Sequence, residues 1–339
     1  MNRIKSVFLT SFTAALMLVV SQPALAGVDR EKIEFISYNP DGYDALISGD
    51  YKKRDDDIHG YLHLASAVGP QPAVIMMHGS GGIKDRLNWY KDLFQAFNDK
   101  GIAVFTVDSF TGRNIGSTAR DQSKLSLAGS VVDAFQALKT LAADPRIDKN
   151  KIAIMGYSRG ATVALYAVHE GIAKGVGGGN RFAAHLPIYP ACQAQWQDIR
   201  STGAPVLMLL GGKDNYTPAK FCTDYADAWT GQGHNVTYKV YPEANHGFDL
   251  PWKPKKCSKC AVFTKCGVAS IDPSGVTTAL EGKISTADGW VSYLTKLYKK
   301  CAKLGATVGR NDEARADSIV SAVDFFSEAF VTTKQASSP

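Results

Sequence analysis

A serine in a short glycine-bounded motif is the strongest chemical signal in this chain. The sequence GYSRG at residues 156–160 follows an apolar run at 152–155 and precedes a segment with helical spacing. The motif needs this strand–turn–helix context, because a sharp turn lifts the serine hydroxyl above the sheet. A chance match in a loop is the alternative, and the position after a buried strand disfavours it. The pattern therefore predicts that Ser158 is a catalytic nucleophile.

A serine hydroxyl is a weak nucleophile that needs a base, and the base needs an acid that orients it. In sheets that carry this motif, the acid and then the base follow the serine along the chain. Asp214 and His246 do so, each just beyond an apolar run, where α/β sheets hold their active sites. Alone, either would be an ordinary turn or loop residue. Together they predict a triad with Ser158, and Asp224 and Asp249 are less well placed alternative acids.

A glycine-rich turn supplies a second element of the same chemistry. The sequence HGSGG at residues 78–82 comes straight after another apolar run, and glycines let backbone amides approach a substrate oxygen closely. We expect the amide of Ser80, or next that of Gly81, to form an oxyanion hole with the amide of Arg159. His78 is interpreted as a structural residue of this loop. A phosphate loop is the alternative, but no Gly-Lys-Ser/Thr follows.

Three side chains are candidates for substrate contact. Arg113 follows a strand end and Arg159 lies beside the nucleophile, so either guanidinium could bind a substrate carboxylate with two hydrogen bonds. The alternative for each is a structural ion pair or a solvated arginine. Tyr157, the other neighbour of the nucleophile, is the third candidate.

The elements that must position these residues alternate between strand and helix patterns from residue 70 onward. Such alternation predicts an α/β fold with a mostly parallel central sheet flanked by helices. The expected strands are residues 73–77, 102–107, 152–155, 182–189, 206–210 and 236–241. The expected helices are residues 89–97, 127–138, 159–169, 221–229 and 290–297. Further strands at 33–38, 45–48 and 58–65 are expected to form an antiparallel N-terminal edge.

The chain begins with the pattern of an export signal. Arg3 and Lys5 precede an apolar stretch at 7–20, and the sequence ALA at 24–26 is a cleavage site. A membrane anchor is the alternative, but the apolar stretch is short for a span. We expect residues 1–26 to be a signal peptide of an exported protein, periplasmic or secreted, with no stable membrane insertion after cleavage.

One domain accounts for the rest of the chain. We expect residues 27–310 to form it, with an insertion of little periodicity at 251–285, and residues 311–339 to form a C-terminal helix with a disordered polar tail. The formal charge of +6 falls to +4 without the signal segment, which holds two basic and no acidic residues. This mild net charge gives no reason to expect that the protein binds nucleic acid.

The six cysteines all follow the cleavage site and are even in number, which indicates disulfides in an oxidising compartment. Six cysteines allow 15 pairings. The sequence CSKC at 257–260 with Cys266 is also compatible with a metal site, but a fourth ligand at short spacing is missing. We therefore expect no metal. The lysines of residues 253–265 are interpreted as a solvated face, with an anion-binding patch as the alternative.

Residues 58–300 resemble the dienelactone hydrolase family, especially its exported members. The matching sequences are PAVIMMHGSGG at 72–82, GIAVFTVDSFTGR at 101–113, KIAIMGYSRG at 151–160, APVLMLLGGKDNYTP at 204–218 and YPEANHGFD at 241–249. The resemblance implies an α/β-hydrolase fold and a disulfide between Cys192 and Cys222. The best-known members use a cysteine nucleophile and a glutamate after the loop histidine, where this chain has Ser158 and Gly79. The serine favours general ester hydrolysis over action on dienelactone.

The sequence thus predicts a serine hydrolase that cleaves a small-molecule carboxylic ester or lactone through an acyl-enzyme, without a cofactor. A prolyl-oligopeptidase-like peptidase is one alternative, although the roughly 70 residues before the main sheet are too few for that family's extra domain. An acyltransferase is the second, and it would need a site that excludes water. A non-catalytic binding module is the third, and an intact triad argues against it.

Overall fold

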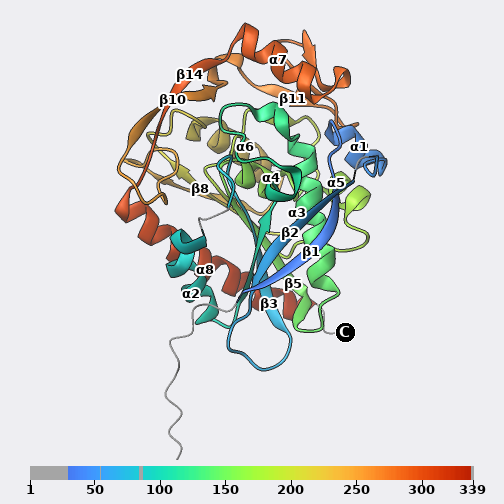
Figure 1. Cartoon of the computed structure of the whole chain (residues 1–339), viewed down its shortest axis with the longest axis vertical. Coiled ribbons are helices and arrows are strands. Elements are labelled where there is room, and N and C mark those ends of the chain that lie inside the picture. Colours follow the sequence, from blue (N-terminus) through green and yellow to red (C-terminus); the bar gives the residue numbers. More distant parts are fainter. Residues whose placement is uncertain (1–29, 54, 84–86, 337–339) are drawn as a thin grey trace, which may run out of the picture.

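The computed structural model of the chain describes residues 30–53, 55–83 and 87–336, so the predicted signal peptide lies outside the described residues. An eight-stranded sheet runs through the centre with helices on both faces (Figure 1). In spatial order its strands are β1 (Glu31–Tyr38), β2 (Asp55–His63), β4 (Ala103–Asp108), β3 (Gln71–Met77), β5 (Ile147–Tyr157), β6 (His185–Ile188), β8 (Val206–Gly211) and β9 (Val236–Tyr241).

The sheet is parallel from β4 to β9, whereas β1 pairs antiparallel with β2 and β2 pairs antiparallel with β4. This arrangement confirms the predicted α/β fold with an antiparallel N-terminal edge. Because the parallel strands all end at one edge, the loops after β3, β5, β8 and β9 lie together there. Those are the loops that carry the predicted site residues.

One predicted strand is wrong. Residues 45–48 belong to a helix, α1 (Tyr43–Ser48), rather than to the N-terminal edge. Tyr43 and Leu46 stand three positions apart and are both buried, which is the spacing of one helix face. Gly49 ends the helix in the left-handed conformation, with φ of 82°, as glycine commonly does.

Two hydrophobic clusters flank the sheet. Alternate residues of β3 point to opposite faces, so Ala73, Ile75 and Met77 enter one cluster while Val74 and Met76 enter the other. The larger cluster packs under the helices α3 (Leu127–Ala142), α4 (Arg159–Tyr166), α5 (Glu170–Val176) and α6 (Ala219–Gly231).

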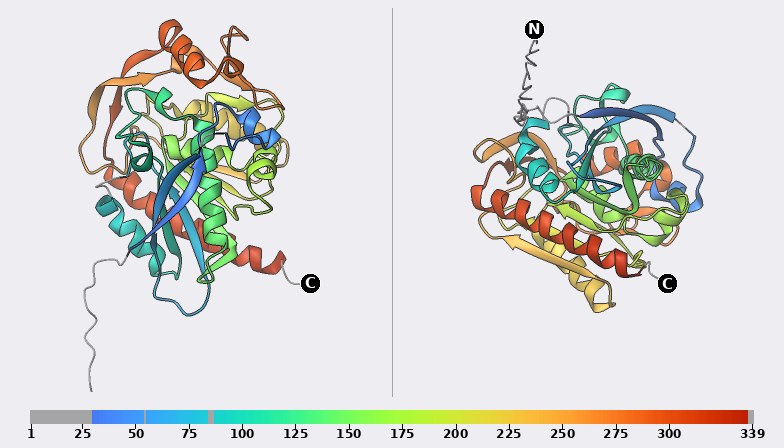
Figure 2. Two further views of the ribbon diagram at one scale, coloured as in Figure 1. Left: turned by 45° about the vertical axis from the view of Figure 1, so that its right-hand side comes forward. Right: turned by 90° about the horizontal axis from the view of Figure 1, so that it is seen from below.

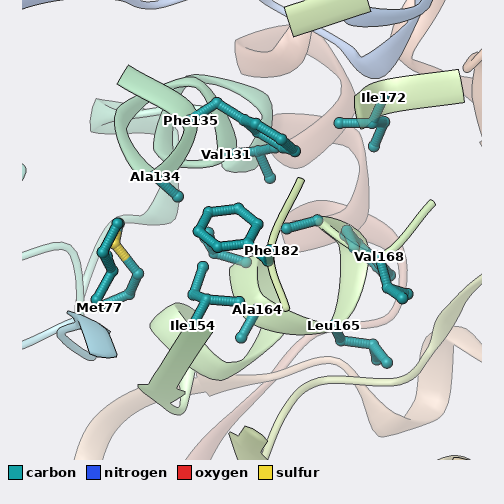
Figure 3. Packing of buried hydrophobic residues seen from close by; sticks show 14 of the residues in the cluster. Met77, Val131, Ala134, Phe135, Ile154, Ala164, Leu165, Val168, Ile172 and Phe182 are labelled. Carbon is teal, nitrogen blue, oxygen red and sulfur yellow. The ribbon is translucent and has the colours of Figure 1, made fainter. Parts of the chain in front are cut away.

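One part of the larger cluster packs closely around Phe182 (Figure 3). The ring of Phe182 lies 5.1 Å from that of Phe135 in α3, with Ile154 of β5 and Ala164 of α4 beside it (Figure 3). The opposite face of the sheet is covered by α2 (Lys91–Asn98) and the long C-terminal α8 (Asp312–Ala336), which run side by side (Figure 2).

A separate layer of short elements covers the upper end of the molecule in Figure 1. We call residues 255–308 the cap. It contains β10 (Lys255–Val262), β11 (Ala269–Ile271), β12 (Thr277–Ala279), β13 (Ile284–Ser285), α7 (Trp290–Lys300) and β14 (Lys303–Val308). β10 pairs with β14, and the three shortest strands extend a small sheet that includes β7 (Ala194–Trp196). Strands of two or three residues leave little periodicity in a sequence.

Short 3₁₀ turns complete the described elements. They are η1 (Leu87–Tyr90), η2 (Thr111–Arg113), η3 (Gln122–Lys124), η4 (Thr264–Cys266) and η5 (Thr286–Asp288). No helix among the described residues is long and apolar enough to span a membrane.

Three disulfides join the six cysteines in pairs: Cys192–Cys222, Cys257–Cys260 and Cys266–Cys301. The first is the pair that the family resemblance implies, and it ties the segment before β7 to α6. The third ties the end of α7 to η4 inside the cap. Because Cys257 is bonded to Cys260, these sulfurs are not free thiolates for the metal site weighed above.

Removing the first disulfide is expected to lower thermal stability much more than removing the second. Cys192 and Cys222 stand 30 positions apart, and cross-linking a loop of that length stabilises by about 3–4 kcal/mol through the unfolded chain. Cys257 and Cys260 stand only 3 apart and restrict that chain less. Calorimetry of the two double Cys→Ala variants measures both effects. Equal losses of Tm would contradict this account.

Candidate active site

The turn between β5 and α4 holds Ser158 in a conformation that non-glycine residues seldom adopt. Its φ is 54° and its ψ is −113°. The chain is crowded on both sides of this turn. A Cβ on Gly156 would lie 2.3 Å from the carbonyl group of Gly160, and one on Gly160 would lie 2.2 Å from the carbonyl oxygen of Met77. Only glycine fits at these two positions, which explains the spacing of the motif.

Three predicted residues are linked by a chain of hydrogen bonds. The Nε2 atom of His246 lies 2.8 Å from Oγ of Ser158, and its Nδ1 lies 2.7 Å from Oδ2 of Asp214. Both His246 and Asp214 are about 95% buried. A carboxylate next to Nδ1 favours the tautomer with the proton there, so that Nε2 can accept the hydroxyl proton of Ser158.

The orientation of Asp214 is fixed by the turn that follows it. Its Oδ1 accepts hydrogen bonds from the amides of Tyr216 at 2.7 Å and Thr217 at 2.8 Å. The hydroxyl of Thr217 lies 3.0 Å from both Oδ2 of Asp214 and Nδ1 of His246. Sequence reasoning missed Thr217. The signal in the sequence that could have indicated Thr217 is an Asp followed three positions later by Thr, which is a common turn pattern.

The two alternative acids are engaged elsewhere. Asp249 accepts a hydrogen bond from the hydroxyl of Tyr189, and burial raises the pKa of the Asp249 carboxyl. Asp224 forms a surface ion pair with Lys220. Of the three carboxylates considered, Asp214 is therefore the one that contacts His246.

The HGSGG loop passes directly against Ser158. A Cβ on Gly79 would lie 3.4 Å from Cβ of Ser158, and the amide of Gly82 closes the turn by donating to the carbonyl of Gly79 at 3.0 Å. His78 anchors the loop, because its Nε2 accepts from the amide of Ser109 at 3.2 Å and its Nδ1 lies 2.8 Å from the carbonyl of Gly79. This geometry fits the structural role expected for His78.

A cavity of about 180 Å³ opens above Ser158. Ser80 and Arg159 line it together with Ser158, whereas Gly81 does not. Arg159 is the first residue of α4, so its amide has no acceptor within the helix. The oxyanion role expected for the amides of Ser80 and Arg159 stays a prediction.

The side chain of Arg159 is held by backbone rather than by a carboxylate. Its Nη2 donates to the carbonyls of Leu125 at 2.6 Å and Ser126 at 2.7 Å, and its Nη1 donates to Oε1 of Gln122 at 3.0 Å. Gln122 in turn donates to the hydroxyl of Ser80 at 3.0 Å. Burial lowers the pKa of Arg159 to about 10. Gln122 thus links the side chains of Ser80 and Arg159, a contact that sequence reasoning missed.

The expected substrate contact of Arg113 is wrong. Its side chain is 4% exposed and does not line the cavity. The guanidinium donates to both oxygens of Asp133 at 2.8 Å and to Asp56 at 2.6 Å. Burial alone would lower the pKa of Arg113, but the two carboxylates outweigh it and raise that pKa above its ordinary value. Arg113 therefore forms the structural ion pair that was its alternative role.

The expected substrate contact of Tyr157 is also wrong. Its ring stacks on Tyr90 at 5.0 Å between centroids and lies 6.0 Å from the ring of Tyr189. It belongs to the hydrophobic cluster between the sheet and α8 and is absent from the cavity wall. Tyr157 is the last residue of β5, and consecutive residues of a strand point to opposite faces of the sheet.

Replacing Arg113 by Met is expected to destabilise the fold without changing substrate preference. Asp133 would be left buried and unpaired, and breaking a buried ion pair in this way costs about 3–5 kcal/mol. Asp133→Asn in the same chain should recover part of this loss. Thermal unfolding measures the stability, and the ratio of kcat/KM for a carboxylate-bearing and a neutral ester measures preference. A selective loss on the charged ester would restore a substrate role for Arg113.

Comparison with known proteins places this site in a family. A sequence model of the dienelactone hydrolase family matches residues 58–265. A protein of Yersinia pestis named "putative carboxymethylenebutenolidase" is 32% identical over 245 residues, which cover 64% of this chain and 86% of that protein. A protein of the same name from Methylorubrum extorquens is 26% identical over 225 residues, covering 62% and 75%. An esterase structure from Thermogutta terrifontis has 17% identity and a TM-score of 0.44, covering 57% of this chain and 79% of that one. The family match spans more than half of the chain, which therefore belongs to the dienelactone hydrolase family.

Proposed function

We propose that Ser158, His246 and Asp214 are the catalytic triad of this hydrolase, which acts on the ester bond of a small-molecule ester or lactone. The observation that carries the proposal is the continuous hydrogen-bond chain from the serine hydroxyl through the imidazole to the buried carboxylate. The family and its named relatives support hydrolysis of ester bonds as the reaction class.

In the proposed reaction, His246 accepts the proton of Ser158 through Nε2 as the hydroxyl oxygen attacks the acyl carbon. Asp214 stabilises the imidazolium that forms and holds its ring in place. His246 then protonates the leaving alcohol, which departs from the tetrahedral intermediate. In the second half-reaction a water gives its proton to His246, attacks the acyl-enzyme and releases the acid, and Ser158 regains its proton.

The negative oxygen of each tetrahedral intermediate would accept hydrogen bonds from the amides of Ser80 and Arg159. The amino end of α4 adds a favourable dipole, because Ser158 immediately precedes it. Thr217 is proposed as a positioning residue, since its hydroxyl lies against both Asp214 and His246. Such preorganised donors commonly supply a large part of the rate enhancement.

We also propose that the protein acts after export. Residues 1–26 have the pattern of a cleavable signal, and the three disulfides fit an oxidising compartment. The expected domain of residues 27–310 would then be the mature enzyme together with its C-terminal helix.

Ser158→Ala is expected to lower ester turnover by about 10³-fold or more, because the nucleophile and the base act as one unit. The measurement is kcat on methyl acetate, followed by proton release. Ser66→Ala, an exposed serine of the loop between β2 and β3, is the matched control and should retain native turnover. Near-native activity of Ser158→Ala would refute the triad.

A further inference from the structure

Part of the wall of the cavity above Ser158 comes from outside the family match. That match covers residues 58–265, yet α1 precedes it and most of the cap follows it. The residues that these outer segments contribute are Tyr43, Cys266, Gly267, Ala269, Thr277, Ala279, Trp290, Tyr293, Leu294 and Leu297. These outer segments therefore shape the space offered to a substrate together with the family core.

The cap and α1 are in direct contact, although they lie at opposite ends of the sequence. A Cβ on Gly275 of the cap would lie 2.4 Å from the amide nitrogen of Asp44 in α1. Both segments lie at the same end of the molecule in Figure 1. Tyr43 of α1 and residues of the cap lie on the wall of the same cavity.

A disulfide fixes the position of the cap wall. Cys266 lines the cavity and is bonded to Cys301 at the end of α7. Leu294 and Leu297 of α7 pack in the same small cluster as Cys266. The helix that contributes Leu294 and Leu297 to the cavity wall is thus held to the rest of the cap by a covalent bond.

The cavity has the size of one aromatic ring. Its volume is about 180 Å³, and a dry cavity of roughly 150 Å³ holds one benzene molecule. A cavity of this volume favours a short chain or a single ring over a long alkyl chain.

The residues that line the cavity favour an aromatic ring over an alkyl chain in the substrate. Aromatic side chains contribute much of the wall: Tyr43 and Tyr166 meet edge to face at 5.3 Å, and Trp290 and Tyr293 stack at 6.0 Å. Aromatic rings gain from such edge-to-face and offset contacts beyond the area they bury. The polar residues Ser80, Gln122 and Thr217 gather with Ser158 in the same cavity, which gives the reacting carbonyl its own polar surroundings.

The cavity suits the acyl group of a substrate better than its alcohol. The alcohol must depart while the acyl group is still bonded to Ser158. A group held under the cap is therefore the one that stays through the acyl-enzyme. Resting on the triad proposed above, we propose that α1 and the cap contribute to an acyl pocket for one aromatic ring, so that the substrates are small esters of aryl-substituted acids such as phenylacetic acid.

The test compares methyl esters that differ only in the acid. Methyl phenylacetate is expected to exceed methyl acetate in kcat/KM by about 10–100-fold, because a phenyl group is buried in the pocket. It should also exceed methyl hexanoate, a chain of similar bulk, and methyl decanoate should fall at least 10-fold below hexanoate. Phenyl acetate carries the ring on the alcohol instead of the acid. Its kcat/KM should exceed that of methyl acetate only by the factor expected from phenol being the better leaving group.

Two variants test the location of the pocket. Leu294→Trp fills the cavity from α7 and should lower the phenylacetate-to-acetate ratio of kcat/KM at least 10-fold. Leu304→Trp adds the same side chain on β14 of the cap, at a residue that is 68% exposed, and should leave that ratio unchanged. Ala279→Leu fills the cavity less and replaces Leu294→Trp if that variant does not fold, as judged by thermal unfolding.

The outcomes separate this inference from the proposed triad. If methyl acetate is hydrolysed in a way that depends on Ser158 but phenylacetate has no advantage over hexanoate, the acyl pocket is refuted and the triad stands. An unchanged ratio in a folded cavity-filling variant refutes the pocket equally. If no ester is hydrolysed in a way that depends on Ser158, the triad itself fails.

Discussion

The close contact between the turn at Ser158 and the end of β3 is the constraint on which the site depends. Gly160 packs so tightly on the carbonyl of Met77 that no side chain fits between them. This contact brings the HGSGG loop against Ser158, directly before the start of α4. The backbone strain at Ser158 is held by the surrounding sheet, whose neighbouring strands hydrogen-bond to β5 on both sides.

Buried charges secure the elements around this turn. Arg113 joins η2 to β2 and α3 through Asp56 and Asp133, and Arg159 binds the carbonyls that lead into α3. Neither guanidinium is free to act as a simple anion receptor, because its donors are already engaged by the fold. Specificity is therefore better sought in the shape of the cavity, to whose wall the cap and α1 contribute.

Features that depend on a local motif, or on the order of residues along the chain, could be predicted from the sequence. Ser158, Asp214 and His246 could be selected because each follows a strand pattern and their order is fixed in this architecture. The partners of Arg113 could not be foreseen, since Asp56 and Asp133 are distant in sequence and only the fold brings them to it. Residues 45–48 were misread because a helix of six residues gives too short a pattern to separate it from a strand. The cavity wall combines α1 with the cap, and no periodicity within either segment signals that contact.

The most direct measurement for the central claim is covalent labelling of the native protein with a fluorophosphonate, followed by mass spectrometry of its peptides. The account predicts one adduct, on the peptide that contains Ser158, and its loss when His246 is replaced by Ala. An adduct on a different serine, or no adduct in a correctly folded protein, would contradict the assignment of Ser158 as the nucleophile.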